Sequence, residues 1–315
     1  MSGGPLGVNV EGADNGYKAL REGAAWIDLS SRGRIRVTGE DRARLLHAMT
    51  TQHVEHLQPG GGGYAFFLNA QGRILGDVNL FCFEDHFLLE TEPELRRKVF
   101  EHLDRYIIAD DVTLEDVTDE TAEIGIEGPH AAATLERLGA PLPDAPYATK
   151  AWGDRLIARV STTGSAGFAV ILPRPGKEAF LRLLGEIPEA TAEQARVVRI
   201  ENGRPRYGEE ITERYLVQET GQLNAVSFSK GCYLGQEIVE RVRALAKIHR
   251  VLRRLEIDSD QPPAAGAKLK SGDADAAEIV SAAYSPALGK TVAMAYVRVP
   301  FAEPGTDISA GVRVV

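Results

Sequence analysis

The sequence predicts an α+β fold that ends in a small, all-β barrel. Up to about residue 203, short strand-like runs alternate with segments whose apolar residues recur at helical spacing. From residue 251 onward the pattern changes to short strand-like runs separated by turns rich in glycine and proline. Such a pattern is typical of a small antiparallel barrel. The chain of 315 residues is long enough for two or three domains.

The first predicted region, residues 1–111, opens with a loose, glycine-rich lead-in of about a dozen residues. The apolar spacing over 40–49 predicts a helix, and a turn at 69–72 between two apolar runs predicts a hairpin. Thr91 and the three residues after it resemble a capping box that opens a further helix. Strand-like runs occupy residues 35–37, 64–68, 74–83 and 87–90.

The second predicted region, residues 112–246, begins with a strand-like run at 123–126 and a Gly-Pro turn. It ends in the octapeptide Lys-Gly-Cys-Tyr-Leu-Gly-Gln-Glu at 230–237. Apolar residues continue at helical spacing after this octapeptide and predict a helix over 235–246. The third region, residues 247–315, is the predicted β-barrel.

Composition excludes several classes of protein. The 36 basic and 45 acidic side chains give a formal charge of −9, which argues against a general nucleic-acid binder. No uncharged apolar run reaches the roughly 18 residues of a spanning helix, and the start has no secretory signal pattern. Cys82 and Cys232 lie too far apart in sequence to suggest a disulfide framework. We therefore expect a cytoplasmic protein with reduced thiols and no membrane partner.

One stretch departs from the acidic balance. Residues 241–254 hold six lysines and arginines and no acid, so the rest of the chain carries −9 − 6 = −15. This stretch could hold an anion, such as a polyglutamate tail or an RNA backbone, or could be an ordinary solvated face. The sequence alone leaves both interpretations open.

Cys232 is the candidate reactive thiol. Lys230 and the N-terminus of the predicted helix both supply positive potential, which stabilises a thiolate. The alternative is a small buried hydrophobic residue, the more common role of a single cysteine. Cys82 lies in an apolar run between two phenylalanines, where burial would keep its thiol inert. His53 and His56 lack the glutamate of a zinc-protease motif, so we expect no metal site.

The octapeptide resembles the signature of the YgfZ-type folate-binding proteins, relatives of the glycine-cleavage T-protein (aminomethyltransferase). Further stretches resemble the same superfamily and follow in the same order over roughly residues 17–315. They are RxGxxxxDxS at 21–30, LNAQGRI at 68–74, GPHA at 128–131, RIENG at 199–203, YGEE at 207–210 and SPALG at 285–289.

This resemblance implies a three-domain ring with tetrahydrofolate or a one-carbon derivative at its centre, together with the C-terminal barrel. It also implies that the folate contacts come from Tyr64, Arg199, Tyr233 and Gln236. T-proteins usually carry two consecutive acids after the hairpin, of which the first is catalytic. At the matching positions this chain has Gly76 and Asp77, so the catalytic position is expected to be vacant unless the alignment slips by one residue.

A second departure lies at Ala169, where T-proteins usually have a glutamate that binds the pterin. Losing such a carboxylate should cost about 2–3 kcal/mol of affinity, so we expect folate to bind in the micromolar range or more weakly.

The sequence thus favours a YgfZ-like, folate-binding auxiliary protein in which Cys232 is the working residue and Lys230 tunes it. The resemblance implies a role in iron–sulfur protein maturation, with iron–sulfur client proteins, assembly factors or tRNA-modifying enzymes as partners. One alternative is a tetrahydrofolate-dependent aminomethyltransferase with Asp77 as its acid/base. A second alternative is a protein-interaction platform that binds no folate.

Overall fold

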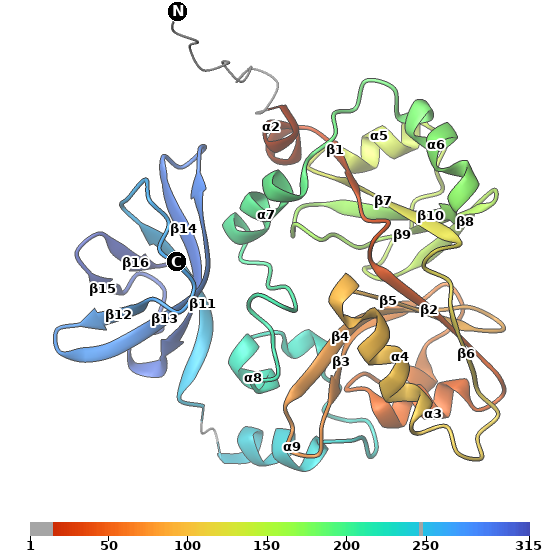
Figure 1. Cartoon of the computed structure of the whole chain (residues 1–315), viewed down its shortest axis with the longest axis horizontal. Helices are drawn as coiled ribbons and strands as arrows, with labels where there is room; N and C mark the ends of the chain where they lie inside the picture. Colours follow the sequence, from red (N-terminus) through yellow and green to blue (C-terminus); the bar gives the residue numbers. More distant parts are fainter. Residues whose placement is uncertain (1–14, 246–247) are drawn as a thin grey trace, which may run out of the picture.

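The computed structural model describes residues 15–245 and 248–315, which form three antiparallel sheets with helices packed against them (Figure 1). The expected lead-in over the first dozen residues lies outside the described part of the chain. The mixed α and β composition and the C-terminal barrel are as predicted. No helix among the described residues is long and apolar enough to cross a bilayer.

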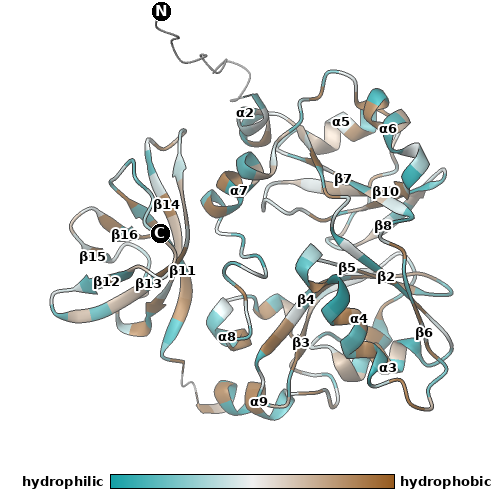
Figure 2. Cartoon of the chain, in the orientation of Figure 1, coloured by the Kyte–Doolittle hydropathy of each residue, from teal (hydrophilic) through white to brown (hydrophobic). Residues whose placement is uncertain are grey.

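The first sheet has the strand order β3-β4-β5-β2-β6. Its helices carry hydrophobic beside hydrophilic residues (Figure 2), and the apolar sides of α3 and α4 pack on the sheet. The core of this sheet also takes in residues from the segment after α7, including Tyr207 and Tyr233. The elements are β2 (Gly33–Thr38), α3 (Arg42–Met49), η1 (Val54–His56), β3 (Gly62–Leu68), β4 (Ile74–Cys82), β5 (Phe87–Thr91), η2 (Pro93–Leu95), α4 (Arg96–Asp104) and β6 (Thr113–Asp116).

The capping box predicted at Thr91 is wrong. Thr91 is the last residue of β5, where it pairs with Gly33, and α4 begins only at Arg96. The Thr91 hydroxyl donates to the backbone carbonyl of Asp77 at 2.6 Å instead of capping a helix. Strand pairing therefore overrides the local capping pattern.

The second sheet has the order β1-β7-β10-β9-β8, so its edge strand β1 precedes the whole first sheet in the chain. The two sheets are consequently interleaved along the sequence. Phe180 and Leu184 of α6 pack on this sheet with residues of α5. The elements are β1 (Ala25–Asp28), β7 (Thr121–Glu127), α5 (Ala131–Arg137), β8 (Thr149–Trp152), β9 (Arg155–Ala158), β10 (Gly167–Pro173), η3 (Arg174–Gly176) and α6 (Lys177–Leu184).

The third sheet forms a nearly closed, six-stranded barrel in the order β12-β13-β14-β11-β16-β15, with β12 lying against β15. Helices α2 and α7 and the segment through α8 and α9 lie between the barrel and the two sheets or beside them (Figure 1). The remaining elements are α2 (Asn15–Glu22), α7 (Ala192–Glu201), α8 (Val217–Thr220), η4 (Leu223–Ala225), α9 (Gln236–Leu245), β11 (Arg250–Ile257), β12 (Lys268–Ser271), β13 (Ala274–Ser285), β14 (Lys290–Arg298), η5 (Val299–Phe301), β15 (Asp307–Ser309) and β16 (Val312–Val314).

Glu201 at the end of α7 ties the barrel to the rest of the molecule. Its buried carboxylate accepts hydrogen bonds of 2.5 Å from both the Tyr17 hydroxyl of α2 and the Ser285 hydroxyl of β13. Arg21 of α2 adds an ion pair to the same carboxylate. One side chain thus joins an N-terminal helix, the central helix and the barrel.

Arg34 of β2 joins the first sheet to the second. Its guanidinium is fully buried and donates to the Glu123 carboxylate of β7 at 3.0 Å. It also donates to the Thr121 hydroxyl at 2.7 Å and the Thr118 carbonyl at 2.9 Å. Because the carboxylate is buried as well, each charge depends on the other for its stability.

We predict that Arg34→Met lowers the free energy of unfolding by about 3–5 kcal/mol, because it leaves Glu123 buried without a cationic partner. Urea denaturation followed by circular dichroism measures this change. The double variant Arg34→Met/Glu123→Leu should recover much of the loss. Arg36→Met, on the same strand in a half-exposed pair with Glu115, should cost less than about 1 kcal/mol. Equal losses at both arginines would contradict the prediction.

Candidate functional site

A cavity of about 360 Å³ lies between the first two sheets and the segment that includes α7. Its walls come from β1, β3, β4 and β5, from β7 and β10, from the loop at 160–163 and from the chain between 192 and 209. This volume lies in the range of small-molecule pockets, roughly 300–1,000 Å³. Three parts of the chain that are distant in sequence therefore meet around one space.

Strand alternation on β4 decides which residue faces this cavity. Asp77 lines the cavity, whereas Gly76 lies against the side chain of Leu95 on the other face of the strand. A Cβ at position 76 would stand 3.1 Å from two carbons of Leu95. An acid at position 76 would thus point away from the cavity. The glycine at this position therefore takes no side chain away from the cavity wall.

Asp77 is a buried carboxyl group held by Tyr64. The Tyr64 hydroxyl donates to Oδ2 of Asp77 at 2.6 Å, across the pair of strands β3 and β4. Burial raises the pKa of Asp77 to about 6, even though the bond from Tyr64 favours its ionised form. A carboxyl group with such a pKa can accept and release protons near neutral pH.

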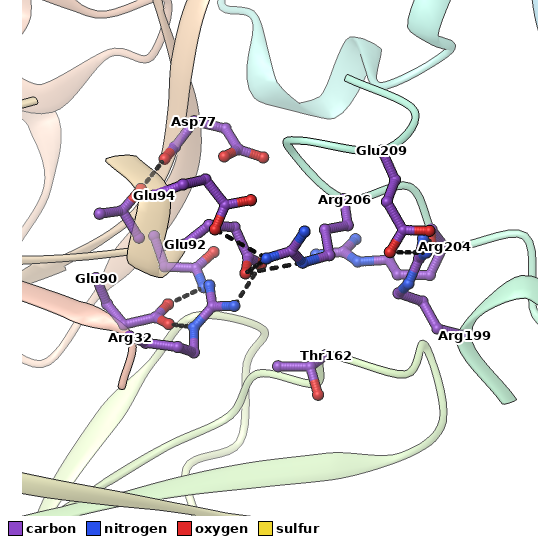
Figure 3. Close-up of polar contacts among 12 residues, drawn as sticks. Arg32, Asp77, Glu90, Glu92, Glu94, Thr162, Arg199, Arg204, Arg206 and Glu209 are labelled. Atoms are coloured by element: carbon purple, nitrogen blue, oxygen red, sulfur yellow. Dashed lines mark hydrogen bonds and ion pairs between the residues drawn. The ribbon is translucent and has the colours of Figure 1, made fainter. Parts of the chain in front are cut away.

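Alternating charges cross the cavity (Figure 3). Arg206 lies between Glu92 and Glu94, with contacts of 3.0 and 2.9 Å, and Glu92 also pairs with Arg32. Arg32 in turn pairs with Glu90 at the end of β5. These ion pairs join the first sheet to the segment that follows α7 and so close one side of the cavity.

A second charged cluster surrounds Arg199. Its guanidinium lies 2.7 Å from the fully buried Glu210 and 3.1 Å from Glu209. Arg196 pairs with the same Glu209 at 2.9 Å. Arg199 therefore lines the cavity with its charge already balanced by two carboxylates.

Glu127 holds the loop that forms the opposite wall. Its buried carboxylate accepts hydrogen bonds from the hydroxyls of Ser161, Thr162 and Thr163 and from the amides of the two threonines. The oxygens of this carboxylate are therefore engaged by the loop. Glu127 acts as a support for the wall, where Thr162 lies across from the ion pairs (Figure 3).

The structure brings together three of the sequence-predicted site residues, Tyr64, Asp77 and Arg199, around this cavity. Ala169 of β10 lines the same cavity and offers only a methyl group. The position at which we expected a pterin-binding carboxylate to be missing therefore lies on the cavity wall.

No residue of the octapeptide at 230–237 is among those that line the cavity. Cys232 is exposed, while the Lys230 ammonium donates to the backbone carbonyls of His47, Thr50 and Gln52, the last two at 2.6 and 2.9 Å. Burial lowers the pKa of Lys230 to about 8. These contacts show Lys230 fastening two chain segments together, and they involve no contact with the Cys232 sulfur.

Tyr233 and Gln236 also take structural places. Tyr233 is buried in the core of the first sheet, and burial raises its pKa to about 12. The Gln236 side chain accepts a hydrogen bond from the Tyr233 amide at 3.0 Å, at the start of α9. Neither residue is among those that line the cavity.

The side chains of the basic stretch, residues 241–254, do not share one environment. Arg250 pairs with Glu219 at 2.8 Å, and Arg253 and Arg254 donate to backbone carbonyls of Ala302 and Glu201. Arg241 is exposed on α9, and Lys247 lies outside the described residues. The arginines of β11 therefore serve the packing of the barrel and do not form one free basic surface.

Sequence reasoning missed most of the cavity wall. Arg32, Arg204, Arg206 and Glu127 line it, yet none stands in a spacing pattern that marks a site. The one available signal was the Arg-Pro-Arg that follows the RIENG motif, which places two cations beside a predicted folate contact. In the described part of the chain, no three His, Cys, Asp or Glu side chains gather as metal ligands.

Fold and site together define a class of protein, in which two interleaved α+β sheets enclose a polar cavity and a barrel follows. Residues 9–230 match the GCVT N-terminal domain, and 250–314 match the glycine cleavage T-protein C-terminal barrel domain. The chain belongs to the glycine-cleavage T-protein family.

Curated relatives carry transferase names. An aminomethyltransferase of Streptomyces avermitilis is 31% identical, covering 95% of this chain and 84% of its own length. An aminomethyltransferase of Aquifex aeolicus is 29% identical, covering 94% and 82%. A putative chloroplastic transferase of Arabidopsis thaliana is 30% identical over 84% of this chain, but the match spans only 64% of the plant protein.

Among solved structures, the glycine cleavage system aminomethyltransferase T from Bartonella henselae superposes with a TM-score of 0.85 at 23% identity. The match covers 95% of this chain and 86% of that protein. This likeness establishes the fold. Together with the family matches, it confirms the predicted T-protein-like fold class, and the relatives' names favour the aminomethyltransferase alternative over the YgfZ-like hypothesis.

We predict that an alkylating reagent at neutral pH labels Cys232 well before Cys82. Cys232 is exposed, whereas Cys82 is buried and burial raises the pKa of its thiol. Peptide mass mapping over a time course measures both rates. Lys230→Ala should loosen the segment around residues 47–52 and lower the melting temperature, because its three carbonyl acceptors lose their donor. Equal labelling of Cys232 and Cys82 in the folded protein would refute the prediction about their alkylation rates.

Proposed function

We propose that the chain is a tetrahydrofolate-dependent transferase that moves a one-carbon unit carried by an amine. The observation that carries the proposal is Asp77, a carboxyl group with a pKa of about 6 that lines a ligand-sized cavity. The aminomethyltransferase names of its relatives support the same reaction class.

The cavity residues fit a folate in part. The Tyr64 ring offers an aromatic surface, Asp77 can meet an amine, and the cation of Arg204 suits an anionic tail. The carboxylates of Glu127 and Glu123 are engaged by protein donors, and Ala169 supplies no acceptor side chain. Pterin binding would therefore depend on backbone groups and be weak.

When bound, tetrahydrofolate supplies the amine nitrogens that accept a one-carbon unit. In this mechanism the ionised Asp77 accepts a proton at Oδ1 or Oδ2 from an amine nitrogen in the cavity and later returns it. The Tyr64 hydroxyl fixes the orientation of the carboxylate through its bond to Oδ2. The surrounding ion pairs hold the walls together around the reacting groups, which helps to keep water out.

A second candidate is the YgfZ-like auxiliary role in iron–sulfur protein maturation. The exposed thiol of Cys232 favours it, because an accessible cysteine in this motif can react with a partner protein. Folate binding without turnover, and loss of support for iron–sulfur enzymes in Cys232→Ser, would favour this candidate over the transferase.

We predict that Asp77→Asn lowers turnover about 100-fold or more while the Kd for tetrahydrofolate changes less than about threefold. The asparagine oxygen can still accept the Tyr64 bond, so only the proton acceptor is lost. Folate-dependent ammonia release from an aminomethyl donor measures turnover, and calorimetry measures the Kd, expected in the micromolar range or above. In the wild type, kcat/KM should rise with pH through about 6, as Asp77 ionises.

Two results would contradict the transferase. Turnover that persists in Asp77→Asn would remove Asp77 from the chemistry. Absence of binding heat with millimolar tetrahydrofolate would remove folate itself and leave the interaction-platform alternative.

Asp77 should also shape the dependence of stability on pH. Its folded pKa of about 6 exceeds the value of about 3.9 in an unfolded chain, so the folded state binds more protons between these values. The contribution of the Asp77 carboxyl group to the free energy of unfolding is therefore full below pH 4 and is lost as the pH rises through 6. Asp77→Asn should therefore be more stable than the wild type at pH 7, by at most about 3 kcal/mol, and equal to it near pH 3.5. Urea titrations at the two pH values test this, and parallel curves would refute it.

A further inference from the structure

The arginines around the cavity differ in how their charges are balanced. Arg32, Arg196, Arg199 and Arg206 all line it and all form ion pairs with glutamates. Arg204 lines the same cavity, but its guanidinium has no ion pair or hydrogen bond with any described residue. The guanidinium lies beside the Tyr64 ring, whose centroid is 5.6 Å from Cζ of Arg204.

The nearby acids are already engaged. Glu92 pairs with both Arg32 and Arg206, and Glu209 pairs with both Arg196 and Arg199. A guanidinium offers five N–H donors in a planar fork that matches a carboxylate. Arg204 is thus a cation at a small-molecule cavity whose donors are available to a ligand.

Tyr64 links this cation to Asp77. The tyrosine hydroxyl is bonded to the Asp77 carboxylate, and the face of the same ring lies beside Arg204. The Asp77 carboxylate and the Arg204 guanidinium therefore lie on the cavity wall with the Tyr64 side chain between them. This arrangement is complementary to a ligand that has both an amine and a carboxylate.

We propose that Arg204 binds a carboxylate of the ligand whose amine meets Asp77. The inference rests on the proposed function and deepens it, because it assigns a residue to ligand selection. The carboxylate can belong to the tail of tetrahydrofolate or to an amino-acid substrate that carries its own carboxylate. Both sources present the same chemistry to the guanidinium, a planar anion that accepts two parallel N–H bonds.

Binding at Arg204 would also act on Asp77. Burial raises the pKa of Asp77, and the positive charge of Arg204 is one of the influences that oppose this rise. A carboxylate on Arg204 offsets that charge, so Asp77 becomes a stronger base when the ligand is seated. Arg204→Gln removes this positive charge. We therefore expect the acidic limb of the pH profile of kcat/KM to move to higher pH.

Calorimetry with two pairs of probes tests the proposal and separates the two sources. Tetrahydrofolate is compared with 6-methyltetrahydropterin, which lacks the tail, and N-methylglycine with its carboxamide, which lacks the carboxylate. Arg204→Gln should raise the Kd of one carboxylate-bearing probe about 10- to 100-fold and leave its partner within about twofold. The affected pair identifies the source. Arg204→Lys, which keeps the charge, should lose less affinity.

Arg97→Gln is the matched control, because Arg97 is a highly exposed arginine of α4 and its loss changes the net charge equally. It should leave all four affinities unchanged. The proposal is overturned if Arg204→Gln, with an unaltered melting temperature, changes no affinity or weakens both members of a pair equally. If the wild type binds N-methylglycine but no tetrahydrofolate, the proposed function fails, and a weaker binding of N-methylglycine by Arg204→Gln would still support the role of Arg204. If it binds no probe, both fail.

Discussion

The buried ion pair between Arg34 and Glu123 is the constraint on which the cavity depends. It lies at the junction of the first two sheets, where each partner is shielded from water and is stable only beside the other. Because the cavity walls come from both sheets, this pair helps to fix their separation, together with the apolar cluster in which Phe81 and Leu88 pack with Ala158 and Ile171. Glu201 has a comparable role at the barrel, where it accepts from side chains of two distant segments.

Most charges around the cavity are engaged in such structural tasks. Glu127 holds a loop, Glu92 bridges two arginines, and Glu210 balances Arg199. Two groups depart from this rule. Asp77 is a buried acid held by a neutral tyrosine, and Arg204 is a cation without an acidic partner among the described residues. Groups whose charge the protein itself leaves unbalanced are the ones most able to respond to a ligand.

The octapeptide shows how a strong sequence signature can have a structural basis. The Lys230 ammonium donates to three backbone carbonyls, and Tyr233 packs in the core of the first sheet. Gln236, the first residue of α9, accepts a hydrogen bond from the Tyr233 amide. These contacts account for three of its positions by packing and hydrogen bonding alone. Cys232 is exposed in the same segment, and packing does not explain its presence in the motif.

The sequence by itself determined the α+β class, the terminal barrel, the T-protein resemblance and three residues of the cavity, Tyr64, Asp77 and Arg199. These follow from local periodicity and from motifs that keep their order along the chain. The tertiary structure alone decided that Asp77 and not Gly76 faces the cavity, because strand alternation has a direction only once the sheet is packed. It alone separated Arg204 from Arg206, two positions away, because ion pairing depends on which distant carboxylates the fold brings near each guanidinium.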